Sequence, residues 1–105
     1  MRHTRIALYD IKAGTFEDIV TQAKTGLVPL FQSSPGFLSY GVAKVDNAAF
    51  ASLSMWETRE QANLASTKAA DWVKANSREN YTLRHNYVGD LAIDTDAREP
   101  VSAVR

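Results

Sequence analysis

Hydrophobic and polar residues alternate along four stretches of the chain and follow a helical spacing along two others. Alternation predicts strands, because successive side chains of a strand point to opposite faces; the stretches are 3–12, 37–45, 49–57 and 81–91. The helical spacing predicts helices over 15–32 and 58–76. The resulting order, βαββαβ, is that of an α+β ferredoxin-like fold with a four-stranded antiparallel sheet.

Local signals mark the ends of the first predicted helix and an irregularity inside it. Thr15 is a typical N-cap residue, and Asp18 lies three positions further on, where an acidic side chain favours a helix start. Gly26 and Pro29 interrupt the helical pattern. Because proline lacks a backbone N–H, we expect a bend near Pro29.

The second predicted helix opens with a capping box formed by Thr58 and Gln61. Its apolar positions form a stripe that we expect to be buried: Ala62, Ala65, Ala69, Trp72 and Val73. Ser66 and Thr67 would divide this helix into two pieces, because their hydroxyls compete for backbone hydrogen bonds.

The two central strands predict a hairpin that turns at Asp46 and Asn47. In the simplest register one face pairs Phe37 with Trp56, Ser39 with Ser54, Gly41 with Ser52, and Ala43 with Phe50. The other face pairs Leu38 with Met55, Tyr40 with Leu53, Val42 with Ala51, and Lys44 with Ala49. The first face carries small side chains in the middle, and the second carries bulky ones. Because both faces are largely apolar, the sheet must be covered on both sides.

A second copy of the chain is the expected cover for one of these faces. Both helices pack on the same side of such a sheet, and a contiguous exposed apolar face is rare in a monomer. We therefore predict a homodimer through the sheet, with Tyr40 and Leu53 at the interface. In the alternative arrangement the faces are swapped, and the small Ser/Gly side meets the partner.

The last predicted strand and the tail complete the chain. Regular alternation would place one set of side chains on one face, namely Tyr81, Leu83, His85 and Tyr87. It would place the other set on the opposite face, namely Thr82, Arg84, Asn86 and Val88. We expect residues 1–93 to form the domain and residues 94–105 to form a tail that is flexible or wraps a partner.

Composition narrows the classes of function. The chain has 105 residues, enough for one domain, and its 12 basic residues balance its 12 acidic residues without a basic stripe. We therefore expect no nucleic-acid partner. The absence of cysteine excludes disulfides and thiol chemistry. Since no apolar run reaches membrane-spanning length and the start lacks a signal-peptide pattern, we expect a cytoplasmic protein with no membrane partner.

Three segments resemble the antibiotic biosynthesis monooxygenase family of dimeric α+β barrels. They are Leu27-Val28-Pro29-Leu30, Pro35-Gly36-Phe37, and Ser54-Met55-Trp56-Glu57 before an alanine-rich helix. The resemblance extends over roughly residues 3–92. It implies a homodimer with a ligand pocket between sheet and helices in each subunit. Some members oxygenate polycyclic phenols without metal or flavin, whereas others degrade haem, isomerise small metabolites or have no known activity.

The haem-degrading branch of this family is a poor match. That branch uses an Asn on the first strand, and a Trp and a His on the second helix. Here the first strand offers Arg5 and Tyr9, and residues 58–76 contain no histidine. The resemblance therefore implies no cofactor. The two histidines lie on different strands without acidic neighbours at metal-binding spacing, so we predict no metal site.

Three residues are the candidate catalytic groups. Trp56 would stack on a planar substrate; otherwise it fills the junction between sheet and helix. Arg84 would stabilise a phenolate; otherwise it is a surface or interface arginine paired with a carboxylate. His85 would remove a phenolic proton; otherwise it is a buried histidine satisfied by a neighbour. His3, close to the terminus, is read as a surface residue.

A second group of residues would bind the substrate. The small-residue face of the hairpin would line the pocket with Phe37, Ser39, Phe50, Ser52 and Ser54. Asn63, on the first turns of the second helix, would lie at the pocket mouth or face water. Close packing of sheet against helix also favours small side chains, and this alternative stays open.

Three functions fit these features. The first is a cofactor-independent monooxygenase that acts on a small aromatic or quinol-like metabolite, bound in an apolar pocket. The second is a non-catalytic dimer that binds a small molecule, for instance in a stress response. The third is a lyase or isomerase of a small carbonyl compound, which would need a smaller pocket with converging polar groups.

Overall fold

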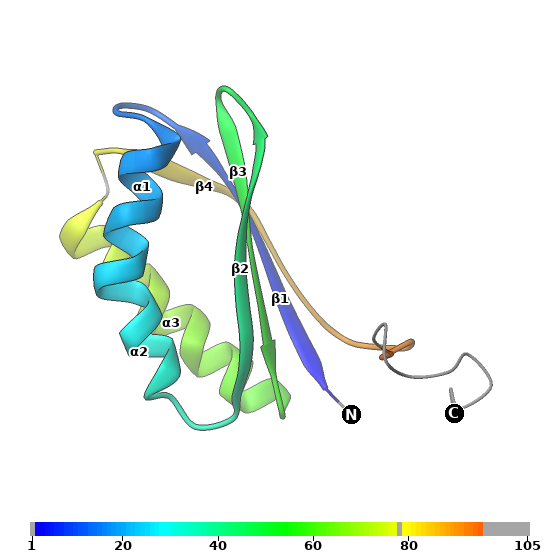
Figure 1. Cartoon of the computed structure of the whole chain (residues 1–105). Helices are drawn as coiled ribbons and strands as arrows, with labels where there is room; N and C mark the ends of the chain where they lie inside the picture. The colour runs from blue at the N-terminus through cyan, green and yellow to red at the C-terminus, as the bar shows by residue number, and fades with distance from the viewer. Residues whose placement is uncertain (1, 78, 96–105) are drawn as a thin grey trace.

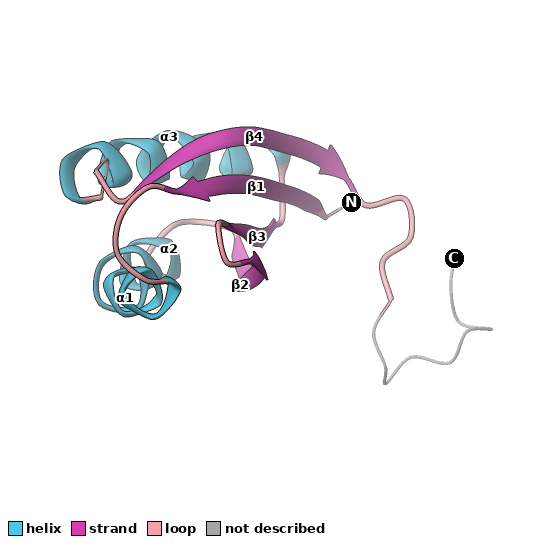
Figure 2. Cartoon of the chain, turned by 90° about the horizontal axis from the view of Figure 1, so that it is seen from above, coloured by secondary structure: helices cyan, strands magenta, loops and turns pink. Residues whose placement is uncertain are grey.

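The computed structural model describes residues 2–77 and 79–95, and within them the predicted α+β ferredoxin-like fold is confirmed. Four strands form one antiparallel sheet in the order β2-β3-β1-β4. They are β1 (His3–Ile11), β2 (Phe37–Asp46), β3 (Ala49–Trp56) and β4 (Tyr81–Asp90). The helices lie together on one face of the sheet, and none of the described helices or strands covers the opposite face (Figures 1 and 2). The tail predicted for residues 94–105 lies outside the described residues from residue 96 onward.

The first predicted helix begins as expected but contains an irregular turn. Thr15 and Asp18 form a reciprocal capping box that starts α1 (Phe16–Gln22). A π-helical turn, η1 (Ala23–Leu27), joins α1 to α2 (Val28–Gln32), and the N–H of Val28 donates to the carbonyl of Ala23, five residues back. The irregularity therefore precedes Pro29, which sits in the first turn of α2, where its missing N–H is tolerated.

The second predicted helix, α3 (Arg59–Asn76), begins at the expected capping box of Thr58 and Gln61. The division predicted at Ser66 and Thr67 is wrong, because α3 is continuous. Both hydroxyls donate to carbonyls four residues earlier in the same helix, at 3.0 Å for Ser66 and 3.3 Å for Thr67. They therefore add to the helical hydrogen bonds instead of replacing them.

The register predicted for the β2–β3 hairpin is wrong beyond its first pair. Phe37 does pair with Trp56, but a bulge follows and leaves Leu38 without a partner, so Tyr40 pairs with Ser54 and not with Leu53. One extra residue on one strand turns the side chains that follow to the opposite face, here as far as a further register shift between Lys44 and Asp46. Tyr40 consequently lies on the helix side, at 5.0 Å from Phe31 between ring centroids, and cannot line the open face.

A bulge also divides the side chains of β4 between the two faces. Tyr9 pairs with Leu83 whereas Leu8 pairs with His85, so Arg84 is the extra residue. The single alternation predicted for this strand is therefore wrong. Before the bulge, Leu83 points to the helix side; after it, His85 points to the open face.

Two clusters of buried side chains join the sheet to the helices. One brings α3 and the first helical segments against the end of β3, and contains Ala23, Leu27, Phe31, Trp56, Ala62, Ala65 and Ala69. The other lies under the opposite end of the sheet and contains Ala7, Tyr9, Ile19, Phe50 and Tyr81. The alanines predicted for the buried stripe of α3 are confirmed, and their small size allows the helix to approach the sheet closely.

The open face of the sheet carries an apolar row that crosses three strands. Leu53 pairs with Ile6, and Ile6 pairs with Tyr87. These three side chains are 40%, 37% and 56% exposed, respectively. An exposed row of this kind at the centre of a sheet is typical of an interaction surface.

Candidate functional site

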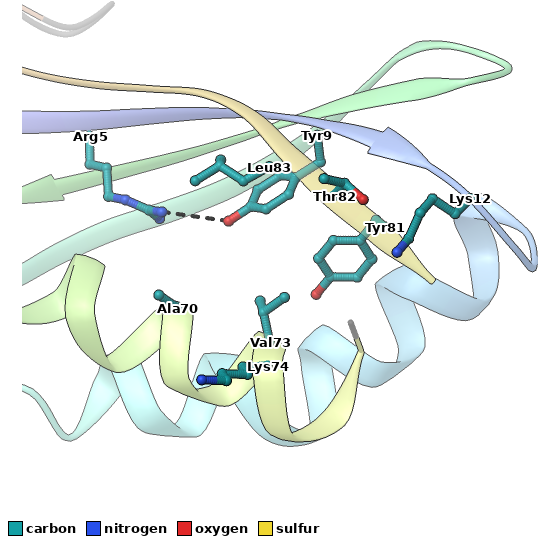
Figure 3. A pocket seen from close by; sticks show the side chains of 9 residues that line it. All are labelled: Arg5, Tyr9, Lys12, Ala70, Val73, Lys74, Tyr81, Thr82 and Leu83. Carbon is teal, nitrogen blue, oxygen red and sulfur yellow. Dashed lines mark hydrogen bonds between the residues drawn. The ribbon is translucent and has the colours of Figure 1, made fainter. Parts of the chain in front are cut away.

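A pocket of about 320 Å³ lies between β1, β4 and α3 (Figure 3). β1 and its exit, β4, and the last turns of α3 provide its lining: Arg5, Tyr9, Lys12, Ala70, Val73, Lys74, Tyr81, Thr82 and Leu83. The volume is near the lower end of the range of about 300–1,000 Å³ that small-molecule sites occupy. The place between sheet and helices is the one that the family resemblance implies.

Arg5 provides a buried positive charge in this pocket. Its side chain faces the helices because it shares the strand parity of Ala7 and Tyr9, and Arg5 is only 3% exposed. Its Nε donates to Oδ1 of Asn86 at 2.7 Å, and its Nη2 donates to the hydroxyl of Tyr9 at 3.5 Å. Among residues 2–77 and 79–95, no carboxylate forms an ion pair with it.

A buried guanidinium without a counterion is costly, since burial removes the hydration that stabilises its charge. Both partners of Arg5 are neutral side chains, so they satisfy individual N–H groups without balancing the charge. The guanidinium presents a planar fork of N–H donors. Such a group is suited to bind an anionic oxygen that enters the pocket.

Aromatic rings form the wall of the pocket beside Arg5. The ring of Tyr9 stacks on Phe50 at 5.0 Å and meets Tyr81 edge-on at 5.1 Å between centroids. Burial raises the pKa of the Tyr81 hydroxyl to about 12. This hydroxyl is therefore protonated at neutral pH, and the wall can hold a flat ring without adding negative charge.

Two lysines lie at the exposed side of the same pocket. Lys12 follows β1 and Lys74 lies in the last turn of α3. Figure 3 shows the Arg5 side chain at one end of the pocket and that of Lys12 at the other, with Tyr9 and Tyr81 between them. The lining thus holds three cations and no acidic residue.

A second pocket of about 360 Å³, with a more apolar lining, lies between the first helical segments and β2. It is bounded by α1, η1, α2 and β2, and is lined by Phe16, Val20, Ala23, Lys24, Val28, Tyr40, Gly41 and Val42. Burial raises the pKa of Tyr40, whose hydroxyl also bonds to Ser52. With so few polar groups, this pocket can hold an apolar body but offers little to orient a reacting atom.

Trp56, the first predicted catalytic residue, lies in the core. It is fully buried, and its Nε1 donates to the hydroxyl of Ser54 at 2.9 Å. Its ring lies 5.5 Å from that of Phe31 and 5.4 Å from that of Phe37. None of these four residues lines either pocket described above.

His85 and Arg84, the other two predicted catalytic residues, are exposed on the edge strand β4. His85 stacks on Tyr87 at 5.6 Å, so it is not a buried histidine. Arg84 makes two hydrogen bonds to Asp10, one of them from Nε at 3.1 Å, and these hold the pKa of the Asp10 carboxyl below its usual value. The structure does not bring either residue together with Trp56.

The predicted substrate-binding residues are also dispersed. Phe50 lies behind the wall of the Arg5 pocket, stacked on Tyr9. Ser52 is buried on the helix side, whereas Ser39 is exposed opposite Met55 because of the bulge at Leu38. Asn63 is exposed on α3. Their roles in binding stay predictions.

The sequence suggested that His3 is a surface residue. In the structure its side chain is buried. Its Nδ1 and Oδ1 of Asp90 are 2.5 Å apart, and its Nε2 has no hydrogen-bond partner among the described residues. Like that of Arg5, its side chain points from β1 toward the helices. In the part of the chain that the structure describes, no group of three or more His, Cys, Asp or Glu residues is placed to hold a metal ion.

The residues that sequence reasoning missed are Arg5, Lys12, Lys74 and Tyr81. A signal for Arg5 was present, because a charged residue stood at an inward position between His3 and Ala7. Lys12 and Lys74 carry no such signal, since only the packing of α3 beside the exit of β1 brings them to one pocket.

None of the described helices is long and apolar enough to cross a membrane. No family model and no curated protein matches the sequence. Solved structures do match the fold. One is SnoaB, a cofactor-independent oxygenase from Streptomyces nogalater, with 14% identity and a TM-score of 0.69 over 93% of this chain and 98% of that one.

Two further structures extend this likeness. A dimeric ferredoxin-like protein from an uncultured marine organism has 11% identity and a TM-score of 0.70, over 91% of this chain and 99% of that one. A proposed antibiotic biosynthesis monooxygenase from Chloroflexus aurantiacus has 20% identity and a TM-score of 0.62, over 84% and 90%. The resemblance predicted from the sequence is confirmed in the fold: the chain is similar in structure to proteins of the antibiotic biosynthesis monooxygenase family.

Proposed function

We propose that this protein is a cofactor-independent monooxygenase that oxidises a small aromatic or quinol-like metabolite in the Arg5 pocket. The observation that carries the proposal is the buried guanidinium of Arg5, which has no carboxylate partner among the described residues and lies beside the aromatic wall of Tyr9 and Tyr81. The fold of SnoaB, a cofactor-independent oxygenase, supports the same reaction class.

The pocket offers what such a reaction needs from a protein. A phenol lowers its own barrier to oxidation when it ionises, and a fixed cation beside the oxygen stabilises the anion. The guanidinium of Arg5 can receive this oxygen, while Tyr9 and Tyr81 hold the ring. The released proton leaves to solvent through the exposed side that carries Lys12 and Lys74.

The atoms and electrons balance without a further reactant. The substrate anion passes one electron to O₂, and the resulting radical and superoxide join in a new C–O bond. Loss of the remaining proton at that carbon breaks the O–O bond, and the outer oxygen leaves as water. A CH₂ group thereby becomes a carbonyl: the substrate gives up four electrons, one oxygen atom enters the product and the other is reduced to water.

The proposed assembly is a homodimer through the open sheet face. The row of Leu53, Ile6 and Tyr87 is apolar, exposed and central to the sheet. A second copy would remove it from water and leave the Arg5 pocket, on the helix side, free to bind a ligand. The similarity to a dimeric ferredoxin-like protein supports this assembly.

The test is oxygen uptake by the purified protein with a panel of anthrones, naphthols and catechols. We expect enzyme-dependent uptake, a loss of about 100-fold in kcat/KM for Arg5→Met, and a smaller loss for Arg5→Lys, which keeps the charge but not the fork of donors. Arg2→Met removes an exposed arginine outside the pocket and serves as the matched control.

Two other outcomes would point to the alternative functions. Binding of the same aromatic compounds without oxygen uptake would favour a non-catalytic binding dimer. Turnover of small carbonyl compounds in the absence of oxygen would favour a lyase or isomerase. Uptake that is unchanged in Arg5→Met would contradict the proposed role of the Arg5 pocket.

A further inference from the structure

We propose that Asn86 is a positioning residue for Arg5: it directs the guanidinium into the pocket and, because it is an amide, leaves the positive charge for the ligand. The inference rests on the proposed function for the role of Arg5 itself. It is carried by the hydrogen bond between the two side chains and by the register of β1 and β4.

The first step concerns the direction of the Arg5 side chain. In the register of the two strands, Arg5 pairs with Val88. Asn86 lies opposite Ala7, which is two residues further along β1 in the direction of Tyr9. The bond of 2.7 Å from Nε to Oδ1 of Asn86 therefore draws the guanidinium toward Tyr9. Figure 3 shows the Arg5 side chain directed toward the Tyr9 hydroxyl, at the border of the pocket.

The second step concerns the N–H groups that this arrangement leaves over. Asn86 accepts the single N–H of Nε, and the Tyr9 hydroxyl accepts one from Nη2 at 3.5 Å. Within residues 2–77 and 79–95, the one fully buried side-chain nitrogen or oxygen without a partner is Nε2 of His3, so Nη1 of Arg5 is not sealed in the core. The outer fork of the guanidinium is thus available to an anionic oxygen.

The third step concerns charge, and a neighbouring contact gives the contrast. On the same side of the same two strands, His3 contacts a carboxylate, that of Asp90, at 2.5 Å. The buried cation Arg5 meets instead an amide, which has nearly the shape of a carboxylate but no charge. A carboxylate in this place would balance the guanidinium and compete with an anionic ligand. The amide accepts the same hydrogen bond without this competition.

The bulge in β4 brings Asn86 to this side of the sheet. In a regular strand Tyr81 and Asn86, five positions apart, would point to opposite faces. The extra residue, Arg84, puts both on the helix side. Bulges are frequent beside functional sites, where they redirect a side chain. One strand therefore supplies both an aromatic wall of the pocket and the amide that positions Arg5.

The test measures whether Asn86 controls the affinity of the pocket for an anion. The probe is para-nitrophenol under nitrogen, because its ionised form absorbs visible light. Its absorbance across a pH series, with and without excess protein, gives the ratio of the affinities for the ionised and the neutral form. We expect the wild-type protein to bind the ionised form about tenfold more tightly, because a guanidinium lies beside the oxygen. Arg5→Met should remove this preference.

Two substitutions at Asn86, which is exposed and therefore tolerant of change, separate charge from direction. Asn86→Asp should bind the two forms equally well, because its carboxylate balances the guanidinium, and it should raise the urea midpoint of the ligand-free protein. A role in stability alone would not lower the preference while raising the midpoint. Asn86→Leu removes the acceptor without adding charge and should show an intermediate preference. The control Asn47→Asp adds the same charge in the exposed β2–β3 turn and should keep the wild-type ratio.

The outcomes separate this inference from the proposed function. Equal affinity for both forms in the wild-type protein, or an equal loss of preference in Asn47→Asp, would overturn the inference. Oxygen uptake that is lost in Arg5→Met but unchanged in both Asn86 variants would overturn it too, and would leave the monooxygenase proposal intact. A preference that depends on Asn86, without oxygen uptake with any compound of the panel, would support the inference and contradict the monooxygenase proposal.

Discussion

Arg5 is the residue at which stability and function are expected to oppose each other. Its charge is buried next to neutral partners, Asn86 and the Tyr9 hydroxyl. In a protein without ligand this arrangement is unfavourable, because the guanidinium has lost water without gaining a counterion. A residue whose buried charge lowers stability is a candidate for ligand binding.

We therefore expect Arg5→Met to raise the free energy of unfolding of the ligand-free protein by about 1 kcal/mol, while it weakens ligand binding. Urea unfolding followed by circular dichroism measures the change. Arg2→Met, which removes an exposed arginine from the same strand end, should shift the midpoint very little. A clear loss of stability in Arg5→Met would mean that its hydrogen bonds outweigh the burial of its charge.

We expect the contact between Asp90 and His3 to contribute to the response of stability to acid. The hydrogen bond from His3 lowers the pKa of the Asp90 carboxyl. A carboxyl whose pKa is lower in the folded than in the unfolded state contributes stability above its unfolded pKa, near 3.9, and loses it as the pH falls through the folded pKa. Part of the loss of stability in acid should thus come from this pair.

Asp90→Asn should consequently flatten the change in the urea midpoint between about pH 6 and about pH 3. The matched control is Asp71→Asn, which alters an exposed carboxyl on α3. Equal slopes in wild type, Asp90→Asn and the control would show that the His3–Asp90 contact does not contribute.

At the level of elements, the first helical segment and α3 depend on one close approach. A Cβ on Gly26, within η1, would lie 2.5 Å from Cζ2 of Trp72. Only glycine leaves room for this ring, so the residue that interrupts the apolar pattern of the sequence is also the one that allows the two helices to pack.

Gly26→Ala should therefore destabilise the protein by about 1–3 kcal/mol, although alanine is the better helix former. Thermal unfolding would measure the loss. Gly89→Ala is the matched control, because a Cβ there meets no atom within 4 Å. A variant at Gly26 as stable as wild type would show that the Trp72 ring moves aside at little cost.

The sequence predicted the bounds of helices and strands better than it predicted the sheet face to which each side chain points. Periodicity and capping residues placed every strand and both helical regions to within a residue or two at most ends, because these signals are local. The bulges at Leu38 and Arg84 could not be predicted, since neither position carries a glycine or proline. Each bulge reverses the faces beyond it, which is why Tyr40 and His85 were placed on the wrong sides.

The site was harder to predict than the fold. The parity of Arg5 was readable from β1, but the pocket also needs Lys74 and Val73 from α3, more than sixty positions later in the chain. Which residues meet across such a distance depends on helix packing, and periodicity does not specify it. Trp56 drew attention as a large aromatic residue, yet its burial places it in the core.

For the whole molecule, the proposed homodimer depends on the open sheet face. We expect Leu53→Glu to give a monomer or an aggregate, because a second copy would bury the carboxylate within the apolar row that Leu53 forms with Ile6 and Tyr87. Light scattering of the purified protein measures this. Leu64→Glu makes the same substitution at an exposed position of α3 and should leave the assembly unchanged.

A well-folded dimer of Leu53→Glu would refute the proposed interface. The bulge at Leu38 makes this test more specific than the sequence did, since Tyr40 lies on the helix side and Leu53 alone represents the predicted pair on the open face.

The bulge in β4 also bears on how this chain should be aligned with its distant structural relatives. Arg84 has no pairing partner in β1, because Leu83 and His85 already pair with the consecutive residues Tyr9 and Leu8. Deleting it would restore a regular strand and keep every other side chain on its present face, whereas deleting any paired neighbour would turn part of the strand over. Evolution can thus lose or gain a residue at this one point of β4 without exchanging the side chains of the helix side and the open face. We expect gaps at position 84 when related chains are superimposed.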